Sequence, residues 1–328
     1  MSQPQMDRPR ERSGTPMTRE AMRLLKAGAV IVAVVLIVGS LPILGVWFFA
    51  DELQPGAATA TFGYSDEEFR FTSADGVSLA ARLRLPVGPG PHPLLIAAHG
   101  SGRATRDHYE QISNALALNG YAFLSYDKRG VGDSEGVYSG VGPGNSEVMF
   151  GLLSADIVAG AEHAAARDDI DGERIGVYGV SQGGWIGPVA LARSDLLRYL
   201  VVISGTTVSV GSEIYYSQLT GETEGAGARG DAADLSAQMA AFAGPHGFDP
   251  LPVLEALDRP ILWILGSGDR SIPIPETVAR LEALVAAGAS IEVVVIPGVG
   301  HGMRNARSGV RQDNFPRIFG WLQEHSGN

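Results

Sequence analysis

Two serine residues lie in a pattern that is typical of a reactive serine on a sharp turn. Ser134 and Ser181 each have a glycine two positions before and two positions after them. Such a turn needs a buried strand before the serine and a helix after it, so that the hydroxyl is raised above the edge of a sheet. An apolar run over residues 175–178 precedes Ser181 and a helical pattern begins near Trp185, whereas Ser134 follows a charged loop. We therefore predict that Ser181 is a nucleophile.

A serine hydroxyl attacks readily only when a base takes its proton and a third group orients that base. His301 follows the apolar run 291–296, and Asp269 follows the apolar run 261–265, so both lie just beyond the carboxyl end of an expected strand. Functional side chains of parallel sheets gather at this edge. We predict His301 as the base and Asp269 as the acid that orients it. Two further aspartates remain as weaker alternatives for the acid, namely Asp249 and Asp258.

Attack on a carbonyl carbon places negative charge on its oxygen, which two backbone N–H groups can hold. One is expected from Gln182, directly after the predicted nucleophile. The other is expected from the loop His99–Gly102, which follows another apolar run. We predict the N–H of Ser101 as this second donor, with that of Gly102 as the alternative. His99 itself is expected to have a structural role in the loop.

The body of the chain alternates strand-like and helix-like segments, which indicates an α/β fold with a mostly parallel sheet and helices on both faces. Continuous apolar runs that end near glycine suit strands buried on both faces. A hairpin is predicted over Glu68–Leu85, and further strands over Leu94–Ala98, Ala122–Tyr126, Ile175–Tyr178, Tyr199–Ile203, Ile261–Leu265 and Ile291–Ile296. Helices are predicted from Asp107 to Gly120 and over Leu152–Arg167, Trp185–Arg193, Pro275–Ala287 and Asn314–His325.

One long segment interrupts this alternation. Residues 206–258 lie between two predicted strands and are rich in glycine, alanine and polar residues. We predict that they form an inserted lid with one or two helices. Four large side chains of the lid are candidates to line a substrate pocket, with packing of the lid onto the body as the alternative interpretation: Tyr215, Tyr216, Leu219 and Phe242.

The N-terminal part of the chain has the pattern of a membrane anchor. Residues 27–50 carry no charge, and a helix of this length would extend about 36 Å against roughly 30 Å of bilayer hydrocarbon. Residues 1–26 carry a net charge of +3, which predicts a cytoplasmic N-terminus and an extracytoplasmic body. A tether is expected over residues 51–65 and a catalytic domain over residues 66–328. Secretion after cleavage of a signal peptide is the alternative.

The composition excludes several classes of protein. The 328 residues carry a net charge of −11 at pH 7, the opposite of what binding to nucleic-acid phosphates requires. The absence of cysteine excludes disulfides, thiolate metal sites and a cysteine nucleophile. No histidine and carboxylate cluster has the spacing of metal ligands, so we expect neither a metal nor another cofactor. The composition leaves the oligomeric state open.

Five motifs in a fixed order resemble those of the α/β-hydrolase superfamily. They are His99–Gly102, Tyr126–Ser134, Gly179–Gly184, Gly268-Asp269 and Gly300–Gly302. The resemblance extends from about Glu68 to Gln323, and Tyr126–Ser134 is similar to a stretch in bacterial hydrolases grouped with serine aminopeptidases and prolyl-oligopeptidase-like enzymes. It implies an α/β-hydrolase fold and places Ser134 in a structural loop. It also implies the chain order serine, acid, histidine that Ser181, Asp269 and His301 follow.

These patterns together predict a membrane-anchored serine hydrolase that cleaves carboxyl esters or related acyl bonds of a small-molecule or lipid-like substrate. A serine aminopeptidase is the first alternative, and it would need lid carboxylates that hold a free amine, such as Glu213, Glu222 or Glu224. An acyltransferase or thioesterase would use the same catalytic residues. The alternative of another class is a non-catalytic, membrane-tethered binding module. Such a module is expected to have lost at least one catalytic residue or the oxyanion loop, and this sequence retains all of them.

Overall fold

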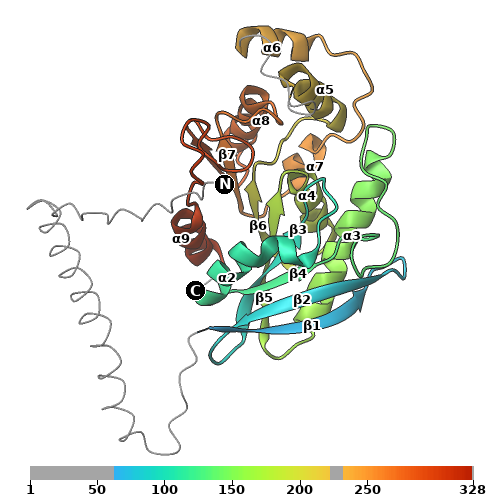
Figure 1. Ribbon diagram of the computed structural model, residues 1–328, viewed down its shortest axis with the longest axis vertical. Helices are drawn as coiled ribbons and strands as arrows, with labels where there is room; N and C mark the ends of the chain where they lie inside the picture. Colours follow the sequence, from blue (N-terminus) through green and yellow to red (C-terminus); the bar gives the residue numbers. More distant parts are fainter. Residues whose placement is uncertain (1–62, 222–231, 327–328) are drawn as a thin grey trace, which may run out of the picture. The chain divides into compact units, whose positions relative to one another are not determined.

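A single eight-stranded sheet forms the centre of the part of the chain that the structure describes (Figure 1). The structure is a computed structural model, and it describes residues 63–221 and 232–326. The predicted anchor over residues 27–50 and most of the tether lie outside these residues. The strands are β1 (Tyr64–Thr72), β2 (Ser78–Pro86), β3 (His92–Ala98), β4 (Ala122–Tyr126), β5 (Ile170–Val180), β6 (Leu197–Ile203), β7 (Ile261–Gly266) and β8 (Ile291–Ile296).

The strand order is β1-β2-β4-β3-β5-β6-β7-β8. The hairpin β1–β2 is antiparallel, and β2 pairs antiparallel with β4. Every later pairing is parallel, from β4–β3 through to β7–β8. The carboxyl ends of β3, β5, β6, β7 and β8 therefore meet at one edge of the sheet, as the predicted α/β-hydrolase fold requires.

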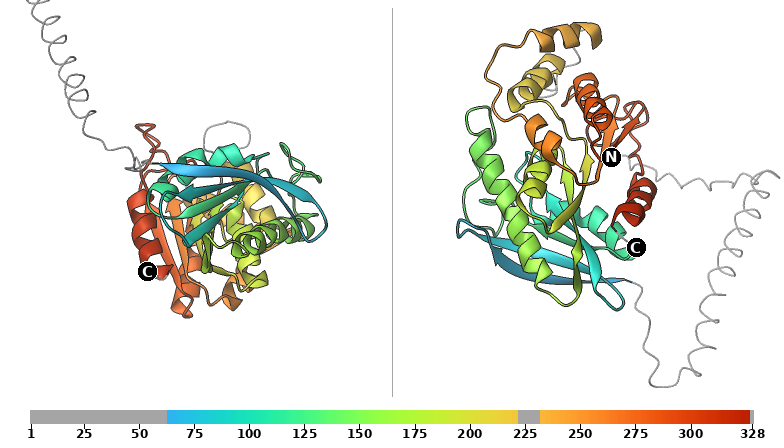
Figure 2. Two further views of the ribbon diagram at one scale, coloured as in Figure 1. Left: turned by 90° about the horizontal axis from the view of Figure 1, so that it is seen from below. Right: turned by 180° about the vertical axis from the view of Figure 1, so that it is seen from behind.

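Helices cover both faces of the sheet (Figures 1 and 2). They are η1 (Arg106–Tyr109), α2 (Glu110–Leu118), α3 (Ser146–Ala165), α4 (Gly183–Arg193), α5 (Val210–Thr220), α6 (Ala232–Ala240), α7 (Leu251–Ala256), α8 (Ile274–Ala286) and α9 (Phe315–His325). Apolar residues of α3, α4 and α8 pack with one face of the sheet, and those of α2 and α9 pack with the other.

The central strand β3 shows why two layers of helices are needed. Its side chains alternate between the two faces, with Leu94 and Ile96 in one apolar cluster and Leu95 and Ala97 in the other. All four are fully buried. A strand that is apolar on both sides must be covered on both sides, because each exposed face would leave apolar area in water.

Among the described residues, α3 is long and apolar enough to cross a membrane by length and composition. It is a core helix of this fold, since Phe150, Leu153 and Ile157 are buried against the sheet. It begins at Ser146, six residues before the predicted start at Leu152. The glycine at position 151 obscures the helical pattern there.

The described residues of the insertion between β6 and β7 form three helices, α5, α6 and α7, where we expected one or two. Ser209 caps α5 by accepting a hydrogen bond from the N–H of Ser212, and Gly221, with φ 70°, ends it. Helix α6, at the top of Figure 1, contacts α8 through a 2.7 Å hydrogen bond from Ser236 to Glu276. Helix α7 has only six residues, which is too short for a clear periodic pattern.

Candidate active site

Ser181 occupies a strained turn between β5 and α4. Its φ angle is 52°, in the left-handed region that side chains other than glycine rarely adopt. The turn is tight because α4 begins two residues later, at Gly183. A Cβ atom at Gly183 would lie 2.7 Å from the carbonyl oxygen of Ala98, and one at Gly184 would lie 2.8 Å from Cα of Gly205. Glycine at both positions thus lets the elbow lie directly against the ends of β3 and β6.

Ser181, His301 and Asp269 form one hydrogen-bonded chain of side chains. Nε2 of His301 lies 3.0 Å from Oγ of Ser181. Nδ1 of His301 lies 2.8 Å from Oδ2 of Asp269. The structure thus brings together the three residues for which the sequence predicts the roles of nucleophile, base and acid.

The carboxyl group of Asp269 is held on both oxygens. Its side chain is fully buried, and Oδ1 accepts hydrogen bonds from the N–H groups of Ser271 at 2.8 Å and Ile272 at 3.2 Å. Oδ2 is therefore left to the imidazole of His301. This arrangement fixes the ring with Nδ1 toward the acid and Nε2 toward the serine.

The backbone of His301 has a partner that the sequence did not indicate. The hydroxyl of Ser204, directly after β6, donates a 2.7 Å hydrogen bond to the carbonyl oxygen of His301. Ser204 is fully buried and has a φ angle of 53°. Its N–H donates to the carbonyl oxygen of Ile264 in β7, so the hydroxyl is fixed to the sheet.

A cavity of about 240 Å³ lies beside Ser181. Ser101 and Gln182, the residues predicted to supply the oxyanion-binding N–H groups, both line it. The loop of Ser101 passes close to the nucleophile, since a Cβ atom at Gly100 would lie 3.7 Å from Cβ of Ser181. The other residues that line the cavity are Val141, Trp185, Val210, Glu213, Ile214, Ser217 and Gln218.

The lid contributes to this cavity through a different face of α5 than the one expected. The lining residues of α5 recur every three or four positions, so they form one side of a helix. The four predicted pocket residues are not among them. The rings of Tyr215 and Phe242 stack on each other at 4.8 Å, and Tyr216 is buried with its hydroxyl 3.4 Å from the carbonyl oxygen of Asp269. Leu219 is likewise absent from the lining. The helical period decides which residues of α5 face the cavity.

Glu213 is the acidic residue among those that line the cavity. Burial raises the pKa of its carboxyl group to about 7, with a smaller lowering contribution from His301 and a raising one from Asp269. A carboxyl group with this pKa changes its charge near neutral pH. Glu222 and Glu224, the other lid carboxylates, lie outside the described residues.

The alternatives considered for the catalytic residues have other partners. Oγ of Ser134 accepts a hydrogen bond from the N–H of Ala80 at 2.9 Å and donates one to the carbonyl oxygen of Asp127 at 2.6 Å. Asp249 binds Arg280, and Asp258 binds Arg259. Nδ1 of His99 pairs with the hydroxyl of Tyr109 at 3.0 Å. All four residues are therefore engaged in structural contacts.

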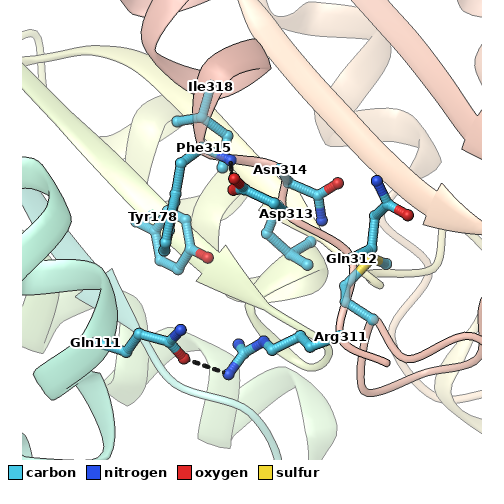
Figure 3. Close-up of a pocket in the computed structure, with 10 residues that line it drawn as sticks. Gln111, Tyr178, Arg311, Gln312, Asp313, Asn314, Phe315 and Ile318 are labelled. Carbon is cyan, nitrogen blue, oxygen red and sulfur yellow. Dashed lines mark hydrogen bonds between the residues drawn. The ribbon is translucent and has the colours of Figure 1, made fainter. Parts of the chain in front are cut away.

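A second cavity, of about 250 Å³, lies on the face of the sheet that α2 and α9 cover (Figure 3). Tyr178 and Phe315 line it, and Arg311 crosses it to donate a 2.6 Å hydrogen bond to Gln111 of α2. Ser181, His301 and Asp269 are not among its lining residues.

Across residues 63–221 and 232–326, no group of three or more His, Asp or Glu side chains is placed to hold a metal ion.

Comparison with known proteins identifies the family. A model of the prolyl oligopeptidase family matches residues 107–328, about two thirds of the chain, and the match includes Ser181, Asp269 and His301. The chain belongs to the prolyl oligopeptidase family. As a member of this family it is a hydrolase of the α/β-hydrolase superfamily, of the serine esterase and peptidase type.

Individual relatives of this prolyl oligopeptidase family member agree with that placement. A protein of Methylorubrum extorquens, provisionally named carboxymethylenebutenolidase, is 26% identical over 84% of this chain and 89% of its own length. Human dipeptidyl peptidase 8 is 27% identical over 80% of this chain, which spans only 29% of that protein. An esterase of Pyrococcus furiosus has the same fold, with a TM-score of 0.60 at 18% identity over 84% of this chain and 97% of the esterase.

Proposed function

We propose that this protein hydrolyses carboxyl esters or related acyl bonds through a covalent acyl-enzyme intermediate. The observation that carries the proposal is the chain of contacts from Ser181 through His301 to Asp269, beside a cavity that Ser181 lines. Each contact has the length of a hydrogen bond. A proton on the serine hydroxyl therefore has a direct path to the imidazole.

In the first half of the proposed reaction, Oγ of Ser181 forms a bond to the carbonyl carbon of the substrate as its proton passes to Nε2 of His301. The π-electron pair of the carbonyl moves to its oxygen, and the positive imidazole is stabilised by Asp269. The tetrahedral species then collapses. The bond to the leaving group breaks, the leaving oxygen takes the proton from Nε2, and an ester of Ser181 remains.

Water completes the cycle by the same steps in reverse. His301 takes a proton from the water, the hydroxide oxygen bonds to the acyl carbon, and the carboxylic acid leaves as Oγ of Ser181 regains its proton. The N–H groups of Gln182 and Ser101 hold the oxyanion in both halves. Removal of one such donor typically costs roughly 3–4 kcal/mol of transition-state stabilisation.

The cavity favours a substrate with a short acyl part. Its volume is about 240 Å³, and Val141, Trp185, Val210 and Ile214 give it an apolar wall. This volume is just below the usual lower limit for ligand pockets. We therefore favour esters with short to medium acyl chains.

A specific observation supports the aminopeptidase alternative as a second candidate. Glu213 lies in the cavity beside Ser181, and a carboxylate there would pair with the free amine of an aminoacyl substrate. The ester proposal predicts little effect of Glu213→Gln on simple esters. The aminopeptidase proposal predicts a large loss on aminoacyl anilides.

We also propose that residues 27–50 anchor the protein in the cell membrane with its catalytic domain outside the cytoplasm. Support comes from the uncharged run and from the net charge of +3 on residues 1–26. Fractionation of cells that express the full chain tests this proposal. The protein should stay in the membrane fraction after a high-salt wash, and external protease should remove the catalytic domain from spheroplasts.

The decisive test of the catalytic proposal is labelling of the full-length protein with a fluorophosphonate probe. We expect the wild type to be labelled, Ser181→Ala to lose labelling and ester hydrolysis together, and Ser134→Ala to retain both. A panel of p-nitrophenyl esters of increasing length, run beside aminoacyl anilides, then identifies the substrate class. An unlabelled, folded wild type would refute the proposal.

A further inference from the structure

Lys128 lies two residues after the end of β4, and its side chain is fully buried. Its ammonium group donates hydrogen bonds to the carbonyl oxygen of Gly100 and, at 2.9 Å, to that of Gly102. It also lies 4.1 Å from the ring centroid of Tyr138. Burial of a lysine is costly unless its N–H groups are bound, so these contacts explain how the site retains it.

Tyr138 binds the carbonyl group between those two. Its hydroxyl donates a 2.7 Å hydrogen bond to the carbonyl oxygen of Ser101 and lies 3.4 Å from Oε1 of Gln182. Tyr138 reaches this place because residue 130 is glycine. Gly130 has a φ angle of +68°, and a Cβ atom there would lie 2.6 Å from the nitrogen of Tyr138.

Lys128 and Tyr138 therefore bind three successive carbonyl groups, those of residues 100, 101 and 102. A trans peptide is planar, and its N–H points opposite to its C=O. The carbonyl of Gly100 shares a peptide with the N–H of Ser101, and the carbonyl of Ser101 shares one with the N–H of Gly102. Contacts that fix these two carbonyls also fix the direction of both candidate oxyanion donors.

We propose that Lys128, together with Tyr138, is a positioning residue that aims the N–H groups of the 100–102 loop at the oxyanion formed beside Ser181. The inference rests on the proposed acyl transfer at Ser181 and adds a residue that touches neither the substrate nor the reacting atoms. Ser101 is exposed, so surrounding side chains do not pack around it, and the loop depends on the hydrogen bonds from Lys128 and Tyr138 for its conformation. A loop held only by its covalent ends would present its N–H groups in many directions.

The hydrogen bonds from Lys128 to the carbonyl oxygens of Gly100 and Gly102 do not require a charged lysine. Burial lowers the pKa of Lys128 to about 7. A neutral amine keeps two N–H groups, one for each of the carbonyls that it binds. Replacing Lys128 by a residue whose side chain has no N–H group therefore abolishes both hydrogen bonds at any pH.

The test compares Lys128→Met and Tyr138→Phe with the wild type in full-length protein, using p-nitrophenyl butyrate. We expect Lys128→Met to lower kcat by about 10- to 100-fold, part of the loss that follows removal of a whole oxyanion donor, with KM changed by less than about threefold. Tyr138→Phe keeps the ring and loses one hydrogen bond, so we expect a loss of about 3- to 10-fold. The inhibition constant of a trifluoromethyl ketone, whose serine adduct carries an oxyanion, should rise in parallel with the loss of kcat/KM.

Arg103→Met is the matched control. Arg103 belongs to the same loop but donates to the carbonyl oxygen of Gly130, so its removal should leave kcat within about twofold. A folded Lys128→Met with normal kcat, or a loss confined to KM, would overturn the inference. If Lys128→Met does not fold, Tyr138→Phe decides, and normal kcat and inhibitor affinity in that variant overturn the inference. A wild type that neither hydrolyses the ester nor reacts with the fluorophosphonate refutes the proposed function itself and this inference with it.

Discussion

The side chain of Ser204 donates a 2.7 Å hydrogen bond to the backbone carbonyl of His301, across 97 residues of sequence. Ser204 directly follows β6, whereas His301 lies in the loop after β8, and β7 separates these two strands in the sheet. The imidazole is thus positioned from two sides. Asp269 binds the ring of His301, and Ser204 binds the backbone of the same residue.

Ser204→Ala should lower kcat about 3- to 10-fold, because the loop that carries the base loses a hydrogen bond worth about 1 kcal/mol. Ser204 has a left-handed φ angle, so an alanine there also keeps backbone strain. Ser204→Gly relieves that strain and still lacks the hydroxyl. Equal losses of kcat in both variants on p-nitrophenyl butyrate would assign the effect to the hydroxyl, and full activity of the glycine variant would contradict it.

Asp269→Asn should lower kcat by roughly 10³- to 10⁴-fold at neutral pH. An amide that donates to Nδ1 of His301 would force the proton onto Nε2, and that nitrogen could then no longer accept the proton of Ser181. The control is Asp249→Asn, whose carboxylate binds Arg280 and should leave kcat within about threefold. A larger loss in the control than at position 269 would move the role of the acid to Asp249.

Ser134→Ala should destabilise the protein without changing its chemistry. The variant leaves the N–H of Ala80 and the carbonyl of Asp127 without their buried partner. The expected cost is about 1–3 kcal/mol, and each kcal/mol lowers Tm by roughly 2–4 °C in a domain of this size. Differential scanning fluorimetry measures the shift. An unchanged Tm together with lost fluorophosphonate labelling would reverse the assignments of the two serines.

Glu213→Gln should change how stability depends on pH. The pKa of Glu213 is raised in the folded protein to about 7, so the folded state binds more protons than the unfolded state between the ordinary carboxyl range and pH 7. The contribution of Glu213 to stability is therefore present at low pH and is lost as the pH rises through about 7. The amide of a glutamine at position 213 does not ionise, so the variant does not lose this stability as the pH rises.

We expect the Tm of Glu213→Gln to match that of the wild type at about pH 4, below the ordinary carboxyl pKa, and to exceed it at pH 8 by a few degrees. Aminoacyl anilides give a separate readout. A carboxylate that holds an amine would make their hydrolysis by the wild type rise with pH relative to simple esters, and the glutamine variant would abolish that rise. A constant Tm difference between pH 4 and 8 would contradict the raised pKa.

The strands were predictable because their sequences carry a strong local signal. The run of β4 and the run of β8 were predicted with their observed ends, since an apolar run next to glycine has few other interpretations in an α/β chain. The spatial order was not predictable from these runs. β4 lies between β2 and β3, and the same alternation of strands and helices fits several orders.

The sequence predicted the residues of the site that lie at strand ends and missed those that act on backbone groups. Ser204 and Lys128 bind carbonyl oxygens of distant loops, and no spacing in the sequence records such a contact. Helix α5 did carry a usable signal. Val210, Glu213 and Ser217 recur at helical spacing and line the cavity, whereas the predicted Tyr215 and Tyr216 do not line it.

The C-terminal end of α5 is joined to the segment that carries Asp269. The hydroxyl of Thr220 donates a 2.6 Å hydrogen bond to the carbonyl oxygen of Arg270, whose guanidinium donates to the carbonyl oxygen of Thr220. The helix that lines the cavity beside Ser181 is therefore hydrogen-bonded to the residue next to Asp269. An outward displacement of α5 would have to break these two hydrogen bonds beside Asp269, so a substrate that fits without moving the helix leaves the acid undisturbed.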